Sequence, residues 1–130
     1  SADTIECSVQ DSCYQSLSLT AEGDILCSAN EACARVKSDI LSTSGNVICS
    51  EQSSCEVLQP ANKISAPLGD ITCGGRKSCK HTNVYAGNNV YCSGDYSCIS
   101  QGGNSRTVSA GNNVYLSGRT ATQFTNIIAG

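Results

Sequence analysis

The ten cysteines are the residues of this chain whose chemistry is easiest to define, and they fall into five pairs with one C-x5-C spacing. Zinc sites use shorter spacings such as C-x2-C, commonly with histidines, and this chain has a single histidine, His81. Redox catalysis typically uses C-x-x-C with one activated thiolate, which a row of identical pairs does not resemble. We therefore expect no metal site and no redox centre, and interpret the pairs as structural disulfides.

A sixth copy of the repeat indicates which cysteines are bonded to each other. Residues 90–98, VYCSGDYSC, return as residues 114–122, VYLSGRTAT, where Leu116 and Thr122 replace both cysteines. Joint loss predicts pairing within a coil, because bridges between coils would leave an unpaired thiol. A short corner that folds back can also bring its ends within the roughly 4.4 to 6.8 Å Cα separation that a disulfide needs. The predicted disulfides are Cys7–Cys13, Cys27–Cys33, Cys49–Cys55, Cys73–Cys79 and Cys92–Cys98.

These pairs mark a repeat of 19 to 24 residues, which is typical of a solenoid. Each copy reads polar, Ile or Val, variable, Cys, small, the alternation of a β-strand with the branched residue and the cysteine on one face. A second strand-like segment precedes each corner of Gly with Asp or Asn, such as Gly23-Asp24. We predict one all-β domain over residues 1–130, a parallel β-helix of about six coils spaced ~4.8 Å apart. Each coil is long enough for three short strands.

Composition argues against several classes of partner. The net charge of −3 includes no run of either sign, so neither nucleic acid nor an anionic membrane is expected as a partner. No stretch approaches the ~18 apolar residues of a spanning helix, so we expect no membrane insertion. Ten cysteines with few aromatic residues indicate a secreted chain, and the start at Ser1 would suit signal-peptide removal. No N-glycan acceptor occurs, but the Ser and Thr content leaves O-glycans open.

Catalysis is not expected either. The chain has no G-x-S-x-G, H-E-x-x-H, phosphate-binding or EF-hand motif. Carbohydrate-cleaving β-helices need clustered carboxylates, whereas Asp24 and Asp70 share one corner column with Asn46, Asn89 and Asn113. We expect those side chains to bond the local backbone. The sequence therefore predicts no enzyme, no catalytic residue and no cofactor.

Ice binding is an alternative function, because some small disulfide-rich β-solenoids bind ice. The two predicted outward-facing rows of residues bear on it. Ice binding needs a flat, regular face, usually of threonines, and neither predicted row is regular. The rows are Glu6, Leu26, Ile48, Thr72, Tyr91 and Tyr115, and Ser18, Leu41, Ser65, Tyr85, Ser109 and Ile128. The semi-exposed tyrosines Tyr85, Tyr91 and Tyr115 are more typical of contact columns with another chain. A carbohydrate-binding adhesive module is a further alternative.

The two ends of the sequence predict self-association. The chain starts with a cysteine-bearing strand around Ile5 and ends at a glycine of the type that precedes such strands in other coils. Ile127 and Ile128 lie beside that end without a polar cap, although open solenoid ends usually carry one. We expect a segment of a longer array, or a subunit that stacks head to tail into an open filament.

The segment CSGDYSC at residues 92–98 resembles the C-S-G-x-x-S-C repeats of secreted, cell-surface proteins of algae and other microbial eukaryotes. The resemblance covers almost the whole chain, although residues 73–79 read CGGRKSC and the sixth copy lacks its bridge. It implies a right-handed parallel β-helix (β-solenoid), which the predicted intra-coil disulfides would staple, and by analogy a surface fibre such as a flagellar hair. Together these features predict a structural extracellular protein that stacks head to tail to build or extend a cell-surface filament.

Overall fold

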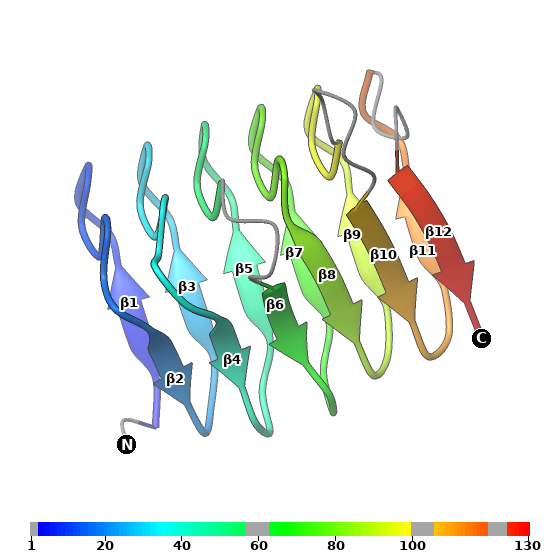
Figure 1. Ribbon diagram of the computed structural model, residues 1–130, viewed down its shortest axis with the longest axis horizontal. Helices are drawn as coiled ribbons and strands as arrows, with labels where there is room; N and C mark the ends of the chain where they lie inside the picture. The colour runs from blue at the N-terminus through cyan, green and yellow to red at the C-terminus, as the bar shows by residue number, and fades with distance from the viewer. Residues whose placement is uncertain (1–2, 57–62, 100–105, 120–124) are drawn as a thin grey trace.

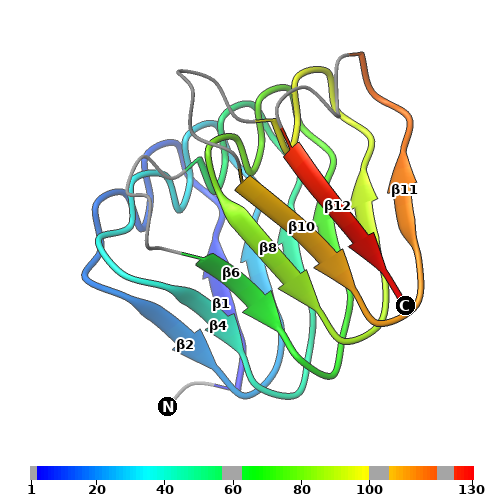
Figure 2. The same cartoon turned by 45° about the vertical axis from the view of Figure 1, so that its right-hand side comes forward.

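The computed structural model describes residues 3–56, 63–99, 106–119 and 125–130, and it shows an all-β parallel solenoid (Figure 1). The strands of the described residues alternate between two six-stranded parallel sheets that run the length of the molecule (Figure 2). The first sheet contains β1 (Ile5–Cys7), β3 (Ile25–Cys27), β5 (Val47–Cys49), β7 (Ile71–Cys73), β9 (Val90–Cys92) and β11 (Val114–Leu116). The second contains β2 (Leu19–Ala21), β4 (Ile40–Ser42), β6 (Lys63–Ala66), β8 (Asn83–Ala86), β10 (Arg106–Ala110) and β12 (Thr125–Ala129).

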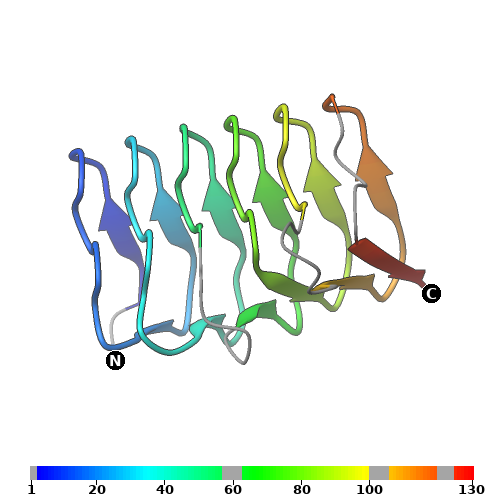
Figure 3. The same cartoon turned by 45° about the horizontal axis from the view of Figure 1, so that its top comes forward.

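The coil is right-handed, as the resemblance implied. In Figure 1 the odd-numbered strands rise behind the even-numbered strands, which descend nearer to the viewer while the chain advances from left to right. The coils follow one another at regular intervals from the N-terminal to the C-terminal end (Figure 3). Each pair of neighbouring strands in a sheet therefore comes from successive coils, and equivalent residues lie beside each other.

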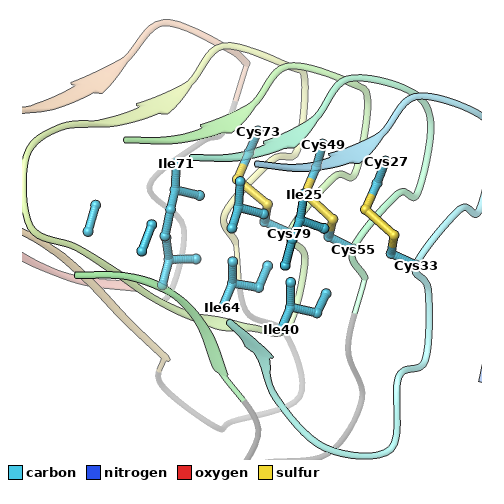
Figure 4. Packing of buried hydrophobic residues seen from close by; sticks show 14 of the residues in the cluster. Ile25, Cys27, Cys33, Ile40, Cys49, Cys55, Ile64, Ile71, Cys73 and Cys79 are labelled. Atoms are coloured by element: carbon cyan, nitrogen blue, oxygen red, sulfur yellow. A yellow bond between two sulfur atoms is a disulfide. The ribbon is translucent and has the colours of Figure 1, made fainter. Parts of the chain in front are cut away.

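The interior is narrow and consists of branched aliphatic residues and alanines together with the disulfides (Figure 4). The three residues of each first-sheet strand point in, out and in, which places the Ile or Val and the cysteine inside, as predicted. Strand register aligns Ile25 with Val47 and Cys27 with Cys49. The second sheet contributes its own inner row, which contains Leu19, Ile40, Ile64, Val84 and Val108. Complete burial of one such side chain contributes about 1.5–3 kcal/mol, so the length of these rows replaces a broad core.

The third side of each coil differs from the expectation of three strands, because the C-x5-C loops form turns instead. In the first loop, successive turns are closed by Ser12 N–H to Val9 O at 2.9 Å and Tyr14 N–H to Asp11 O at 3.1 Å. The third residue of each turn has a left-handed backbone, with φ of 60° at Asp11 and 57° at Cys13. This is the arrangement of a type II turn, repeated in overlapping steps.

These loops stack in register and form a third hydrogen-bonded ladder without strands, at the top of each coil in Figure 1. Asp11 N–H donates to Asn30 O at 3.1 Å, and Cys33 N–H donates back to Ser12 O at 3.0 Å. The left-handed residues recur in every described loop, at Gln15, Glu31, Cys33, Arg35, Ser53, Cys55, Lys77, Cys79, His81, Tyr96 and Cys98. The ladder thus holds many non-glycine residues in a conformation that costs about 1–2 kcal/mol each.

We expect Gln15→Gly to stabilise the fold by about 0.5 kcal/mol. Gln15 is exposed and has φ of 56°, so glycine relieves the left-handed strain, which exceeds its entropic cost of about 0.5–1 kcal/mol. The matched control is Lys37→Gly, at an exposed position that is not left-handed, which we expect to destabilise the fold by about 0.5–1 kcal/mol. Urea unfolding of both variants measures the difference. Equal losses of stability in both would contradict the strain argument.

The Asp and Asn side chains at the glycine-containing corners before the first-sheet strands form a column, as predicted. They accept hydrogen bonds from the next coil rather than from the local backbone. The Asp24 carboxylate accepts the Asn46 backbone N–H at 2.8 Å, and the Asn46 side-chain carbonyl accepts the Asp70 N–H at 2.8 Å. In the same way, the Asp70 carboxylate accepts the Asn89 backbone N–H at 2.9 Å, and the Asn89 side-chain carbonyl accepts the Asn113 N–H at 3.2 Å. This column therefore links five successive coils.

Candidate functional site

The disulfide column is the feature that both sequence and structure place at the centre of the molecule. The structure contains all five predicted bridges, with Cα–Cα separations of 5.9 to 6.1 Å. Each bridge spans one loop, so it joins the end of a first-sheet strand to the third hydrogen-bonded ladder. Figure 4 shows three of them, Cys27–Cys33, Cys49–Cys55 and Cys73–Cys79. Nine of the cysteines are fully buried, and Cys13 in the first loop is partly exposed. Five disulfides indicate an oxidising environment for this chain.

Sulfur atoms of neighbouring bridges lie close together. The Sγ atoms of Cys7, Cys27 and Cys33 are within 4.8 Å of one another, and two further groups of three have the same closeness. A metal would need thiolates, whereas these sulfurs are bonded in pairs. Their closeness follows from the stacking of one bridge on the next.

The serine that precedes the second cysteine has a role that the sequence reasoning missed. The hydroxyls of Ser54, Ser78 and Ser97 donate to backbone carbonyls three residues earlier, at 2.8, 2.7 and 2.6 Å. All three serines are buried, so each hydroxyl would lose its partner if the loop opened. The recurrence of S-C at the end of the repeat was the available signal. This serine closes the loop that the disulfide spans.

The outer row of the first sheet is confirmed by strand register. Glu6 aligns with Leu26, and Tyr91 aligns with Thr72 on one side and Tyr115 on the other. The rings of Tyr91 and Tyr115 stack with centroids 5.0 Å apart and an interplanar angle of 6°. Stacked in this way, each ring covers one face of the other, and Tyr115 is 48% exposed whereas Tyr91 is half-buried.

The outer row of the second sheet needs one correction. Thr20, not Ser18, aligns with Leu41, because β2 begins at Leu19 and Ser18 precedes the strand. The rest of the row follows the prediction, with Tyr85 between Ser65 and Ser109 in register. The candidate contact columns consequently lie on two different sheets, with Tyr85 on one and the Tyr91–Tyr115 pair on the other.

The remaining tyrosines each lie beside a cationic side chain from a neighbouring coil. The Arg35 guanidinium lies 6.0 Å from the centroid of the Tyr14 ring, and the Lys63 ammonium lies 5.9 Å from that of Tyr85. Arg76 lies 5.8 Å from the ring of Tyr96. Such contacts contribute about 0.5–1 kcal/mol at exposed sites. They tie the outer surfaces of successive coils together.

Two titratable groups, Glu31 and His81, have pKa values shifted by their neighbours. A hydrogen bond with Asp11 raises the pKa of the exposed Glu31 carboxyl, since these two acidic residues occupy equivalent places in successive loops. Partial burial, and secondarily the neighbouring charge of Lys80, lowers the pKa of His81. The shift favours the neutral form of the His81 ring. The backbone carbonyl of His81 accepts a hydrogen bond from Arg106 Nε at 3.0 Å.

The predicted assembly residues lie at the outer strands of the stack but face different ways. Ile127 aligns with the buried Val108 and faces inward, although it is 38% exposed. Ile128 aligns with Ser109 and faces outward, with 56% exposure. Ile5 aligns with Ile25 on the inner face of β1 and is partly buried. Ile5 and Ile127 thus belong to the two end faces of the interior, whereas Ile128 belongs to the outer surface.

Part of the sequence prediction lies outside the described residues. Thr122, which replaces the second cysteine of the sixth copy, is in this group, and so are residues 120–121 and 123–124. Within the described ranges, the chain has no helix that is long and apolar enough to span a bilayer. The fold and its cysteine column together define a cysteine-rich parallel β-solenoid. Comparison of the chain with protein-family models, curated proteins and solved structures gives no match.

Proposed function

We propose that this chain is a structural protein whose coils stack to build or extend an extracellular, cell-surface filament. The support comes from the way each coil interacts with the next. Backbone ladders, an Asp/Asn column and cation–aromatic contacts all connect successive coils, whereas each disulfide stiffens a single coil. A further coil could therefore be added by the same contacts, without any covalent bond.

The single observation that carries this proposal is the exposed inner face at β11 and β12. Val114 and Leu116 are half-buried and Ile127 is 38% exposed, whereas Val90 and Val108 one coil earlier are fully buried. Exposed strand edges present unpaired backbone groups that invite pairing with another strand. A further parallel coil would bury these side chains, each contributing up to about 1.5–3 kcal/mol.

At the opposite end of the first sheet, β1 offers the backbone donor that would pair with an acceptor on β11. Ser28 N–H donates to Cys7 O at 3.1 Å, and the contact recurs along the sheet as far as Ser117 N–H to Cys92 O, also at 3.1 Å. By the same register, Leu116 O in one copy would accept from the N–H of Ser8 in a second copy. The resulting contact is heterologous, joins β1 to β11 and propagates as an open filament.

We expect Ile127→Asp to abolish head-to-tail association of the 130-residue chain. A carboxylate on the inner face would be buried without a partner in a stacked junction, which is costly. The control is Ile128→Asp, which places the same charge on the adjacent, outward-facing residue and should leave association intact. Negative-stain microscopy and sedimentation at increasing protein concentration measure filament length and mass.

The outcomes separate the alternatives clearly. Filaments of wild type and Ile128→Asp, with only monomers of Ile127→Asp, support stacking through the inner face. A wild-type chain that stays monomeric at high concentration contradicts self-stacking. Thermal hysteresis or selective binding on a glycan array would instead favour the ice-binding or adhesive function. The outer row is irregular, with Ile48 beside Thr72, and so lacks the regular face that ice binding needs.

A further inference from the structure

We propose that Tyr91 and Tyr115 form an oxidative modification site, at which the two phenol rings couple to a dityrosine that links β9 to β11. The two residues are register partners on adjacent strands, and their rings lie 5.0 Å apart between centroids with only 6° between their planes. Tyr115 is 48% exposed and Tyr91 is half-buried, so both residues are partly accessible from solvent. The geometry is that of two reactants already brought together.

The other tyrosines have different surroundings. Tyr14, Tyr85 and Tyr96 each have a cationic side chain within about 6 Å of the ring centroid, at 6.0, 5.9 and 5.8 Å respectively. A nearby positive charge opposes removal of an electron from the ring, by the same electrostatics that favours the cation–aromatic contact. Among the described residues, Tyr91 and Tyr115 form the stacked aromatic pair. Both proximity and charge therefore select this pair.

The reaction balances with a haem peroxidase and hydrogen peroxide as the oxidant. Each phenol loses one electron and one proton to become a phenoxyl radical, and the two radicals join through a carbon–carbon bond between their ortho positions. Each ring then transfers its ortho hydrogen to its own oxygen as a proton, which restores both phenols. The pair loses two hydrogen atoms in total, and one hydrogen peroxide is reduced to two molecules of water. Holding both rings in contact favours this coupling over coupling between molecules.

The cross-link would supply a type of bond that the rest of the described structure does not have. All five disulfides join residues within one coil, and the sixth copy has Leu116 in place of a bonded cysteine. A dityrosine between Tyr91 and Tyr115 would join two coils directly, next to that copy. Because both rings lie on the outer face of the sheet, the site does not depend on the stacking proposed above.

The test treats the full chain, at low protein concentration, with a haem peroxidase and hydrogen peroxide. We expect dityrosine fluorescence, a mass loss of two hydrogens per chain and a cross-linked peptide that contains both residues. The initial rate per molecule should not change with protein concentration, since the coupling is intramolecular.

Two conservative variants make the test specific. Tyr115→Phe keeps the ring stack but removes the phenol, and we expect at least a tenfold lower yield of monomeric dityrosine product. Tyr85→Phe, which changes a partly exposed tyrosine on the other sheet, should leave the yield unchanged. Circular dichroism verifies that both variants are folded. Undiminished intramolecular coupling in Tyr115→Phe, or cross-links that map mainly to other tyrosines, would overturn the proposal.

Discussion

Gly75→Ala is expected to destabilise the solenoid by about 3 kcal/mol, whereas Gly74→Ala, one residue earlier, should change stability by less than about 0.5 kcal/mol. A Cβ at Gly75 would lie 2.1 Å from the carbonyl oxygen of Glu51 and 2.2 Å from its carbonyl carbon. Both are backbone atoms of the preceding coil, so no side chain can move to make room. The coils themselves would have to separate, with loss of the ladder contacts on both sides.

Gly74 supplies the matched control. A Cβ there would meet only the Ser93 hydroxyl at 3.7 Å, which is an ordinary van der Waals distance. Urea unfolding of the two variants and wild type measures the difference in unfolding free energy. Similar stabilities for both variants would show that coil spacing at Gly75 relaxes easily. The same close approach recurs at Gly94, where a Cβ would lie 2.1 Å from the carbonyl oxygen of Gly75, and it explains the glycine of the C-S-G segment.

Reduction of all five disulfides is expected to abolish folding. Each bridge closes a loop with a sequence separation of 6 residues, worth about 2 kcal/mol in the chain-entropy model. Together the five contribute on the order of 10 kcal/mol, which is comparable with the whole stability of a domain, about 5–15 kcal/mol. The bridges also hold the second cysteine of every pair in a left-handed conformation that reduced cysteine would not favour.

The experiment reduces and alkylates the chain in denaturant, dilutes it into buffer and records far-UV circular dichroism and protease resistance. A sample taken through the same steps without reductant is the control and should refold. Without denaturant, reduction should start at Cys7–Cys13, since Cys13 is the partly exposed cysteine and the other nine are fully buried. A fully alkylated chain that keeps its β-spectrum and a cooperative melt would contradict the expectation.

The sequence was sufficient to predict the repeat, the parallel β-helix, the inner rows and the disulfide pairing. These predictions came from comparing the repeats with one another, because each coil places different residues at the same structural positions. The loss of both cysteines at Leu116 and Thr122 predicted the bonding partners that the first five copies show. The outward row from Glu6 to Tyr115 followed from the two-residue period of a strand.

Other features depended on contacts between coils and could not be derived from local pattern. The third side was expected to be a strand, yet alternate residues such as Asp11 and Gln15 adopt left-handed angles. Nothing about their side chains requires this conformation. It persists because the backbone N–H groups of Asp11 and Gln15 donate to the carbonyls of Asn30 and Ala34 in the next coil. The displacement of Ser18 by Thr20 in the outer row has a related cause, since the loop sets where β2 begins.

What the sequence by itself determined was therefore the set of residues that share a face, since a repeating chain places equivalent side chains in columns. What only the tertiary structure decided was how each column interacts. Asp24 bonds the next coil rather than its own turn, Tyr91 meets Tyr115 ring to ring, and Ile127 faces inward while Ile128 faces out. Each of these outcomes depends on the distance and register between coils. Both are fixed by packing and hydrogen bonds between residues that are far apart in the chain.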